Sequence, residues 1–451
     1  MKKLNKKLGV GIATALLLTT SAFADSADEI SELKRQIEML MKKTQELEKK
    51  SIIQEKKSIV LEEQSQALID ETSDLKTGFN FNKVDVDKTF SGLGPAASKV
   101  YTSKSPLSIG GYGEMYYSHY DEPQGSSEYT NKVDVYRFVP YIGYKFSDNI
   151  ILNVELEFEH GGVDSDDGGE IIVEFMYLDF LVNENFNVRL GHMLVPMGLI
   201  NEKHEPILFN TVQRPNTSKY LIPSTWHESG AMIFGEVTEG WNYKLSATTG
   251  IDSSKTGNKW LRNGRGGSYV NTDPSFGLTA RVDYTGTNGL LLGASVYHDE
   301  DIDMWDVHAD YKVGGFRAYG VYTESTRSNS AAYSAGYDQA IADGESIADA
   351  NTAGNAESTD AQGGFINFSF DLLTLTNKTN DKLPIFVQFE SVETRESVVS
   401  GSSLDTRDST TIGINYFPHP QVVLKADYVM QDSYENTPDT DIISASIGFV
   451  F

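Results

Sequence analysis

The sequence predicts an all-β fold: a 16-stranded antiparallel transmembrane β-barrel over residues 106–451, preceded by a periplasmic α-helical coiled coil over residues 25–76. Three observations support this prediction. After residue 106, short segments alternate apolar and polar side chains with the period of two that is typical of strands. The connections between these segments alternate between tight turns and longer links. The chain also begins with a leader of the kind that directs export.

The composition limits the class of protein. The 451 residues include 39 Gly, 23 Tyr and 22 Phe but only 13 Pro and no Cys, and 39% of them are hydrophobic. This apolar content is low for a bundle of membrane helices but suits a barrel, because only every second residue of a membrane strand meets lipid. Without Cys the chain forms neither disulfides nor thiolate metal sites. A formal net charge of −26 argues against nucleic acid as a partner. The acidic excess has two interpretations, solvated outer loops or a field that attracts cations to a pore.

Residues 1–24 have the pattern of a signal peptide. Lysines precede an apolar run at residues 8–18, and Ser21-Ala22-Phe23-Ala24 supplies the small residues of a cleavage site. The apolar run is short for a membrane-spanning helix, and an uncleaved anchor is the alternative. We therefore expect an exported chain that begins after residue 24.

Residues 25–76 are dense in Glu, Lys and Gln and contain no Gly or Pro. Leucines recur every seven residues, interrupted only at Gln54, and this repeat predicts a coiled coil. The column consists of Leu33, Leu40, Leu47, Leu61, Leu68 and Leu75. Because the second column turns polar after Ile37, a lone solvated helix is the alternative. The natural partner of the coil is the same segment of other subunits, so we expect a homotrimer. Residues 77–105 have scattered Gly, Ser and Asn without a period and are predicted to be a linker.

Sixteen alternating segments follow, an even number as in bacterial single-chain barrels. They start near residues 107, 133, 150, 171, 186, 229, 241, 276, 290, 304, 315, 363, 384, 406, 421 and 441. The connections at residues 147–149, 183–185, 238–240, 286–289, 314–315 and 418–420 are tight turns. Because the coil and both barrel ends lie on the side of the tight turns, we assign that side to the periplasm and the long links to the outside.

The alternation separates a lipid face from a lumen face. In residues 150–160, for example, Ile, Leu, Val and Phe alternate with Asn and Glu. The charged residues assigned to the lumen and predicted to line a pore are Arg137, Glu155, Glu157, Glu159, Arg189, Lys244, Arg281, Asp283, Asp306, Asp310, Lys312, Arg317, Glu390, Lys425 and Asp427, and the same face includes Glu114, Lys145 and Asp371. A lumen with so many charges is predicted to hold water. A soluble β-sandwich would alternate too, but it would not need the leader, the even strand count and the loop asymmetry together.

The connection at residues 196–227 combines apolar and aromatic anchors with charges. Loops of this length in a compact fold are usually functional or disordered. Our hypothesis is that this loop folds into the lumen and narrows it. The charges predicted at the constriction are Glu202, Lys203, Glu205, Arg214 and Lys219. An outward cap or a contact between subunits is the alternative.

The same region resembles a known family. Residues 191–199 (Gly-His-Met-Leu-Val-Pro-Met-Gly-Leu), Arg214-Pro215 and residues 229–235 are similar to a strand end, a loop arginine and the following strand of the phosphate-selective (O and P type) porins. The terminal Phe451 is similar to the aromatic residue that the assembly machinery reads in outer-membrane barrels. The resemblance implies trimeric channels with an inward loop and a lumen carrying ladders of arginine and lysine. The lumen assigned here has no such excess of basic residues, so we expect a general or weakly cation-preferring pore.

Signals for catalysis and metal binding are weak. Residues 164–170 are rich in carboxylates but lack the spacing of an EF-hand loop, so a Ca²⁺ site and a solvated turn are both open. His204-Glu205 and His227-Glu228 lack the second histidine, four residues away, of a zinc-protease helix. We therefore predict no enzyme activity, no cofactor and no metal ligands.

These patterns favour a passive channel for small hydrated solutes or ions in the outer membrane of a Gram-negative bacterium. The expected partners are outer-membrane lipid, further copies of the chain and the permeating solutes, but no nucleic acid. A second interpretation makes the barrel an anchor for a coiled coil that contacts the cell wall or a partner protein. A third interpretation, an outer-membrane hydrolase, needs a catalytic group at the outer rim.

Overall fold

The computed structural model describes residues 27–78, 84–124, 129–163, 168–255, 260–266, 274–376, 380–402, 406–433 and 439–451. The predicted signal peptide at residues 1–24 and residues 164–167 of the acidic loop lie outside these ranges. The chain divides into two compact units, Met1–Lys76 and Thr77–Phe451. Each unit is described by itself.

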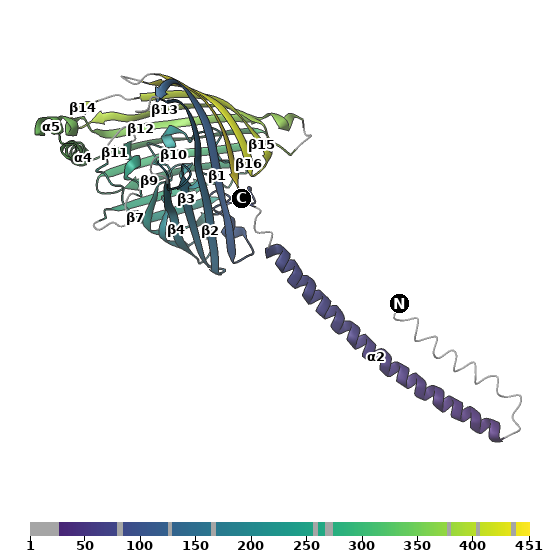
Figure 1. Ribbon diagram of the computed structural model, residues 1–451. Coiled ribbons are helices and arrows are strands. Elements are labelled where there is room, and N and C mark those ends of the chain that lie inside the picture. Colours follow the sequence, from purple (N-terminus) through teal and green to yellow (C-terminus); the bar gives the residue numbers. More distant parts are fainter. Residues whose placement is uncertain are drawn as a thin grey trace. The chain divides into compact units, whose positions relative to one another are not determined.

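The first unit contains all but the last two residues of α2 (Ala27–Gly78), a continuous helix of 52 residues that Figure 1 shows in purple. Its leucine column faces solvent, with Leu33, Leu40, Leu47 and Leu61 exposed by 45%, 64%, 60% and 65%. Among the described helices, none has both the length and the apolar character needed to cross a bilayer. The predicted helix is present, and its association into a coiled coil stays a prediction.

The second unit is a closed β-barrel in which every neighbouring pair of strands is antiparallel (Figure 1). Its strands are β1 (Leu107–Gln124), β2 (Tyr129–Ser147), β3 (Ile150–Glu159), β4 (Glu170–Leu181), β5 (Asn187–Leu194), β6 (His227–Thr238), β7 (Trp241–Thr249), β8 (Phe276–Tyr284), β9 (Leu290–His298), β10 (Ile302–Val313), β11 (Phe316–Arg327), β12 (Ser358–Asp371), β13 (Pro384–Val398), β15 (Thr406–His419), β16 (Val422–Ser433) and β17 (Thr440–Val450). Among the described strands, the two-residue β14 (Gly401–Ser402) pairs only with the last two residues of β13. The barrel closes where β1 pairs with β17, from Tyr112 opposite Val450 to Tyr120 opposite Ile442. The predicted 16-stranded barrel is confirmed, and each predicted start lies within five residues of the observed one.

Short helices occupy several connections. The link between β11 and β12 contains α4 (Asn329–Ala342) and α5 (Ile347–Ala356), which pack against each other. Both begin at a serine N-cap, because the side chains of Ser328 and Ser346 accept a backbone N–H of the first turn. The 3₁₀ helices are η1 (Asn201–Lys203), η2 (Asn216–Ser218), η3 (Trp260–Gly264) and η4 (Leu372–Leu375).

The strands have one apolar outer face and one mixed inner face. In β10, Trp305 and Val307 are 39% and 48% exposed on the outside, whereas Met304 and Asp306 are 3% and 1% exposed on the inside. This alternation is what a strand between lipid and a polar interior requires. The face assignment made from the sequence therefore agrees with the burial along this strand.

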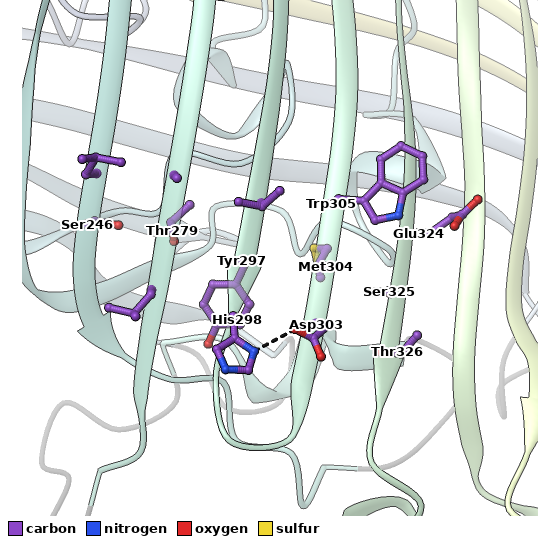
Figure 2. A pocket seen from close by; sticks show the side chains of 14 residues that line it. Ser246, Thr279, Tyr297, His298, Asp303, Met304, Trp305, Glu324, Ser325 and Thr326 are labelled. Atoms are coloured by element: carbon purple, nitrogen blue, oxygen red, sulfur yellow. Dashed lines mark hydrogen bonds and ion pairs between the residues drawn. The ribbon is translucent and has the colours of Figure 1, made fainter.

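The outer face has a hollow of about 570 Å³ across β7 to β11, shown in Figure 2. Leu245, Leu278 and Trp305 line it, and at one edge His298 Nδ1 lies 2.7 Å from Asp303 Oδ1. Figure 2 shows this pair beside the turn that joins β9 to β10, which belongs to the side of the long links. The side chains of the pair are 67% and 71% exposed.

Residues 84–105 differ from the predicted linker. The side chains of residues 93–100 are buried inside the barrel, with Leu93, Ala96 and Val100 at 0%, 1% and 2% exposed, whereas Asp85 and residues 87–89 are exposed. Within this segment α3 (Lys99–Thr102) forms a single turn. Glycine is required at Gly94 because a Cβ atom there would collide with the side chain of Glu205. The segment has no helix or strand period because it is shaped by the cavity that it fills. We call residues 84–105 the N-terminal insert.

Candidate functional site

The loop between β5 and β6 lies inside the barrel, and we call residues 195–226 the inward loop. Asn201 closes its base. The Asn201 side chain donates to the carbonyl oxygens of Val195 at 2.8 Å and Trp226 at 3.0 Å, and its Oδ1 accepts the N–H of Trp226 at 2.8 Å. One buried amide thus joins both ends of the loop, and its oxygen supplies the acceptor that the buried N–H of Trp226 needs.

The first turn of the inward loop is fixed to β8 and β10. The N–H of Gly198 donates to Asp306 Oδ2 at 2.9 Å, and Arg281 donates to the carbonyl oxygen of Gly198. Gly198 has a φ of +67°, a conformation that favours glycine. The ring of His308 lies between Asp306 and Asp283, at 2.7 Å and 2.9 Å, and so connects the two carboxylates.

The distal part of the loop reaches the other wall. Asp427 of β16 accepts the N–H of Val212 at 2.6 Å, and Glu390 of β13 accepts the N–H and hydroxyl of Thr217 at 2.7 Å and 2.9 Å. Lys425 of β16 donates to two further loop carbonyl oxygens at 2.9 Å. Because β8 and β10 hold one part of the loop and β13 and β16 another, the loop crosses the lumen.

The inward loop also holds the N-terminal insert. Glu205 Oε1 accepts the backbone N–H groups of Ala96 and Ala97, both at 3.0 Å. Asn153 of β3 donates to the carbonyl oxygen of Ala97 at 2.9 Å. Burial raises the pKa of Glu205 to about 7, although the two backbone donors oppose this shift. The two segments therefore meet at a buried carboxyl group.

Most charges predicted to line the pore face the interior, but they are paired with other side chains. The ion pairs are Arg137 with Glu114 (2.8 Å) and Glu157 (3.4 Å), Arg189 with Asp179 (2.7 Å), Lys244 with Glu202 (2.5 Å), Arg281 with Asp283 (2.7 Å) and Arg317 with Asp310 (2.9 Å). Glu155 is buried against the inward loop, whereas Glu159 is only half-buried and the Lys312 side chain is 55% exposed. These residues face inward, but most of them do not line a column of water.

The residues predicted at the constriction have different environments. Glu202, Glu205 and Arg214 are 3%, 1% and 4% exposed, and Lys203 and Lys219 are half-buried. Burial lowers the pKa of Lys203 and lowers that of Lys219 to about 7. Of the predicted set, only Lys203 and Lys219 are therefore partly exposed.

Cavities whose linings include charged side chains lie on both sides of the inward loop. A cavity of about 720 Å³ on the side of the tight turns is lined by Lys203 and Lys244 among others. A cavity of about 280 Å³ on the side of the long links is lined by Arg214, Lys219 and Glu390 among others. The inward loop therefore has a cavity lined in part by charged side chains on each side.

Sequence reasoning did not find Asn201, Ala96 or Ala97, because their roles arise only when distant segments meet. It also did not find Glu174, which shares the buried interior with Glu155. No periodic signal marks any of these positions.

Solved structures define the class of fold. OmpF of Salmonella typhi, solved in complex with daunomycin, matches with a TM-score of 0.50 and 11% identity over 76% of this chain and 97% of that chain. The outer-membrane channel DcaP of Acinetobacter baumannii matches with a TM-score of 0.49 and 12% identity over 76% and 97%. The likeness to OmpF shows the barrel fold of outer-membrane porins.

No family model matches the chain. An uncharacterized protein of Aquifex aeolicus (strain VF5) is 34% identical over 384 residues, which cover 81% of this chain and 84% of that protein. The chain belongs to the same family as this A. aeolicus protein.

Proposed function

We propose that this protein is an outer-membrane channel through which small hydrated solutes or ions diffuse past the inward loop. The observation that carries the proposal is that this loop is bonded to opposite walls of a closed barrel and has on each side a cavity whose lining includes charged side chains. The apolar outer face supports lipid contact, and the porin fold supports a Gram-negative outer membrane as the location.

The resemblance to phosphate-selective porins does not lead us to propose phosphate as the solute. The basic side chains Arg137, Arg189 and Arg281 are buried and bonded to carboxylates, so they form no free ladder for an anion. We propose a general or weakly cation-preferring pore, which also suits the net charge of −26.

Planar-bilayer recordings of the full mature chain test this proposal. We expect discrete conductance steps, and at pH 6 the variant Lys219→Glu should shift the reversal potential in a salt gradient toward cation selectivity. Lys255→Glu is the matched control, because the Lys255 side chain is 52% exposed on an outer loop. Absence of conductance steps, or equal shifts in both variants, would contradict the proposed pore.

A second candidate function is a periplasmic role for α2. The specific observation is the exposed leucine column: no other part of the described chain packs over Leu40 and Leu47, which are 64% and 60% exposed. We propose that α2 associates in a homotrimer and contacts the cell wall or a partner protein. Removing residues 25–76 should leave conductance intact but weaken the envelope if this role is real. We expect no hydrolysis of lipid or peptide substrates by the purified protein.

A further inference from the structure

Three buried side chains from separate elements meet behind the inward loop. Glu155 comes from β3, Glu174 from β4 and His204 from the loop, and they are 0%, 0% and 2% exposed. One potential ligand atom of each lies within 4.8 Å of the others. His204 Nε2 is 3.1 Å from Glu155 Oε1 and 3.9 Å from Glu174 Oε2.

A β-bulge turns Glu174 toward this cluster. In the pairing of β3 with β4, Glu155 is opposite Phe175 and Leu156 is opposite Val173, so Glu174 is an extra residue without a partner position. Both Glu174 and Phe175 are buried, although consecutive residues of a regular strand point to opposite faces. Bulges are frequent next to functional sites because they re-aim a side chain.

The carboxylates have unused ligand atoms. Neither oxygen of Glu174, nor Oε2 of Glu155, has a hydrogen-bond partner among the described residues, and all three atoms are buried. Buried polar atoms without partners are rare and costly in folded proteins. A ligand that supplies positive charge at this point would satisfy them.

The histidine is oriented as a ligand. His204 Nδ1 lies 2.7 Å from the carbonyl oxygen of Asn201, so Nδ1 carries the hydrogen and Nε2 directs its lone pair at the carboxylates. Metal-binding histidines are commonly oriented in this way by a backbone carbonyl oxygen.

The neighbouring charges leave room for a cation. Glu157 lies nearby on β3 and has Arg137 at 3.4 Å, but Arg137 is also bonded to Glu114 at 2.8 Å. Arg214 approaches from the loop side and donates to the carbonyl oxygen of His204 at 3.3 Å. Counted together with Glu155 and Glu174 of the cluster, these neighbours give four carboxylates and two guanidinium groups, which is a carboxylate excess.

We propose that Glu155, Glu174 and His204 bind a divalent transition-metal ion of the Zn²⁺ class, which fastens the inward loop to β3 and β4. One imidazole nitrogen and two carboxylates form a donor set that Zn²⁺ accepts, and a hard ion such as Mg²⁺ would prefer oxygen ligands only. The site does not depend on whether the barrel conducts.

The test is Zn²⁺ binding by the full mature chain in detergent, after chelator treatment and dialysis. We expect one Zn²⁺ per chain in the wild type. Glu174→Gln and His204→Gln should each lower the affinity for Zn²⁺ by roughly tenfold or more, as is usual when a residue that supports a metal site is changed. Glu170→Gln is the matched control, because Glu170 is an exposed residue of the same strand. Binding of the same strength in Glu174→Gln, or no stoichiometric Zn²⁺ in the wild type, would overturn the proposal.

X-ray absorption of the Zn²⁺-loaded wild type gives a result that does not depend on the variants folding. We expect a shell of nitrogen and oxygen atoms that includes one imidazole. A shell without imidazole would place the ion elsewhere and overturn the site, and so would tighter binding of Mg²⁺ than of Zn²⁺.

Discussion

The contact between Glu205 and the N-terminal insert gives the sharpest prediction. Glu205→Ala removes the acceptor of two buried N–H groups, those of Ala96 and Ala97. A buried donor left unpaired costs about 1–3 kcal/mol, so docking of the insert should weaken by about 2–6 kcal/mol. Since about 1.4 kcal/mol is a factor of ten, the undocked population should rise by at least about thirtyfold.

Hydrogen exchange of the backbone amides measures this population. In detergent, the amides of residues 93–100 should exchange faster in Glu205→Ala than in the wild type by at least the same factor. Glu205→Gln is the control, because an amide oxygen can still accept both N–H groups. Equal protection in the wild type and Glu205→Ala would refute the reasoning that this carboxyl holds the insert.

The pH dependence follows from the pKa of Glu205, which burial raises to about 7. Glu205 binds its proton more tightly when the insert is docked than when its carboxyl group is free in water, where its pKa is about 4.3. Docking is therefore strongest below about pH 4.3 and weakens as the pH rises toward 7. At about 1.4 kcal/mol per pKa unit, the loss amounts to about 3–4 kcal/mol. Amide protection should therefore fall over this range, after correction for intrinsic exchange, and Glu205→Gln should not show the fall.

Three further predictions concern the loop base, the pore charge and α2. Asn201→Ala removes three hydrogen bonds at the loop base and should lower the free energy of unfolding by about 2–4 kcal/mol in denaturant titrations; an unchanged midpoint would contradict the role of Asn201. Because burial lowers the pKa of Lys219 to about 7, Lys219 should be charged at pH 6 and mostly neutral at pH 8. Cation preference in bilayers should therefore increase with pH, and Lys219→Gln should abolish the change. The double variant Leu40→Asp, Leu47→Asp should make a peptide of residues 25–76 monomeric in analytical ultracentrifugation, whereas self-association that survives both charges would exclude the leucine column as the contact.

The barrel could be predicted because its signals are local. A strand that separates lipid from a polar interior must alternate, so Trp305 and Asp306 reveal their faces from the sequence alone. Tight turns such as residues 147–149 likewise depend on a few adjacent residues. For these reasons the number of strands, their starts and the direction of most charged side chains were available without coordinates.

The environment of those side chains was not available. Arg189 faces inward as predicted, but only the folded chain shows that Asp179 takes both its charge and its hydrogen bonds. A count of inward-facing charges therefore overestimated how much of the barrel interior is in contact with water. At the β-bulge, Glu174 is an extra residue, so the side chains before and after it no longer follow one strict inward–outward alternation. A prediction that assumes strict alternation cannot locate such an extra residue.

The sequence by itself determined a closed sheet, its two faces and a helix without Gly or Pro, because each depends on the order of neighbouring residues. Tertiary structure alone decided that the N-terminal insert and the inward loop lie inside the barrel, and that Glu205 joins them. The physical reason is that these segments have no regular period of their own. Their conformation is set by hydrogen bonds to strands that are distant in the sequence, such as the bond between Val212 and Asp427, which are 215 residues apart.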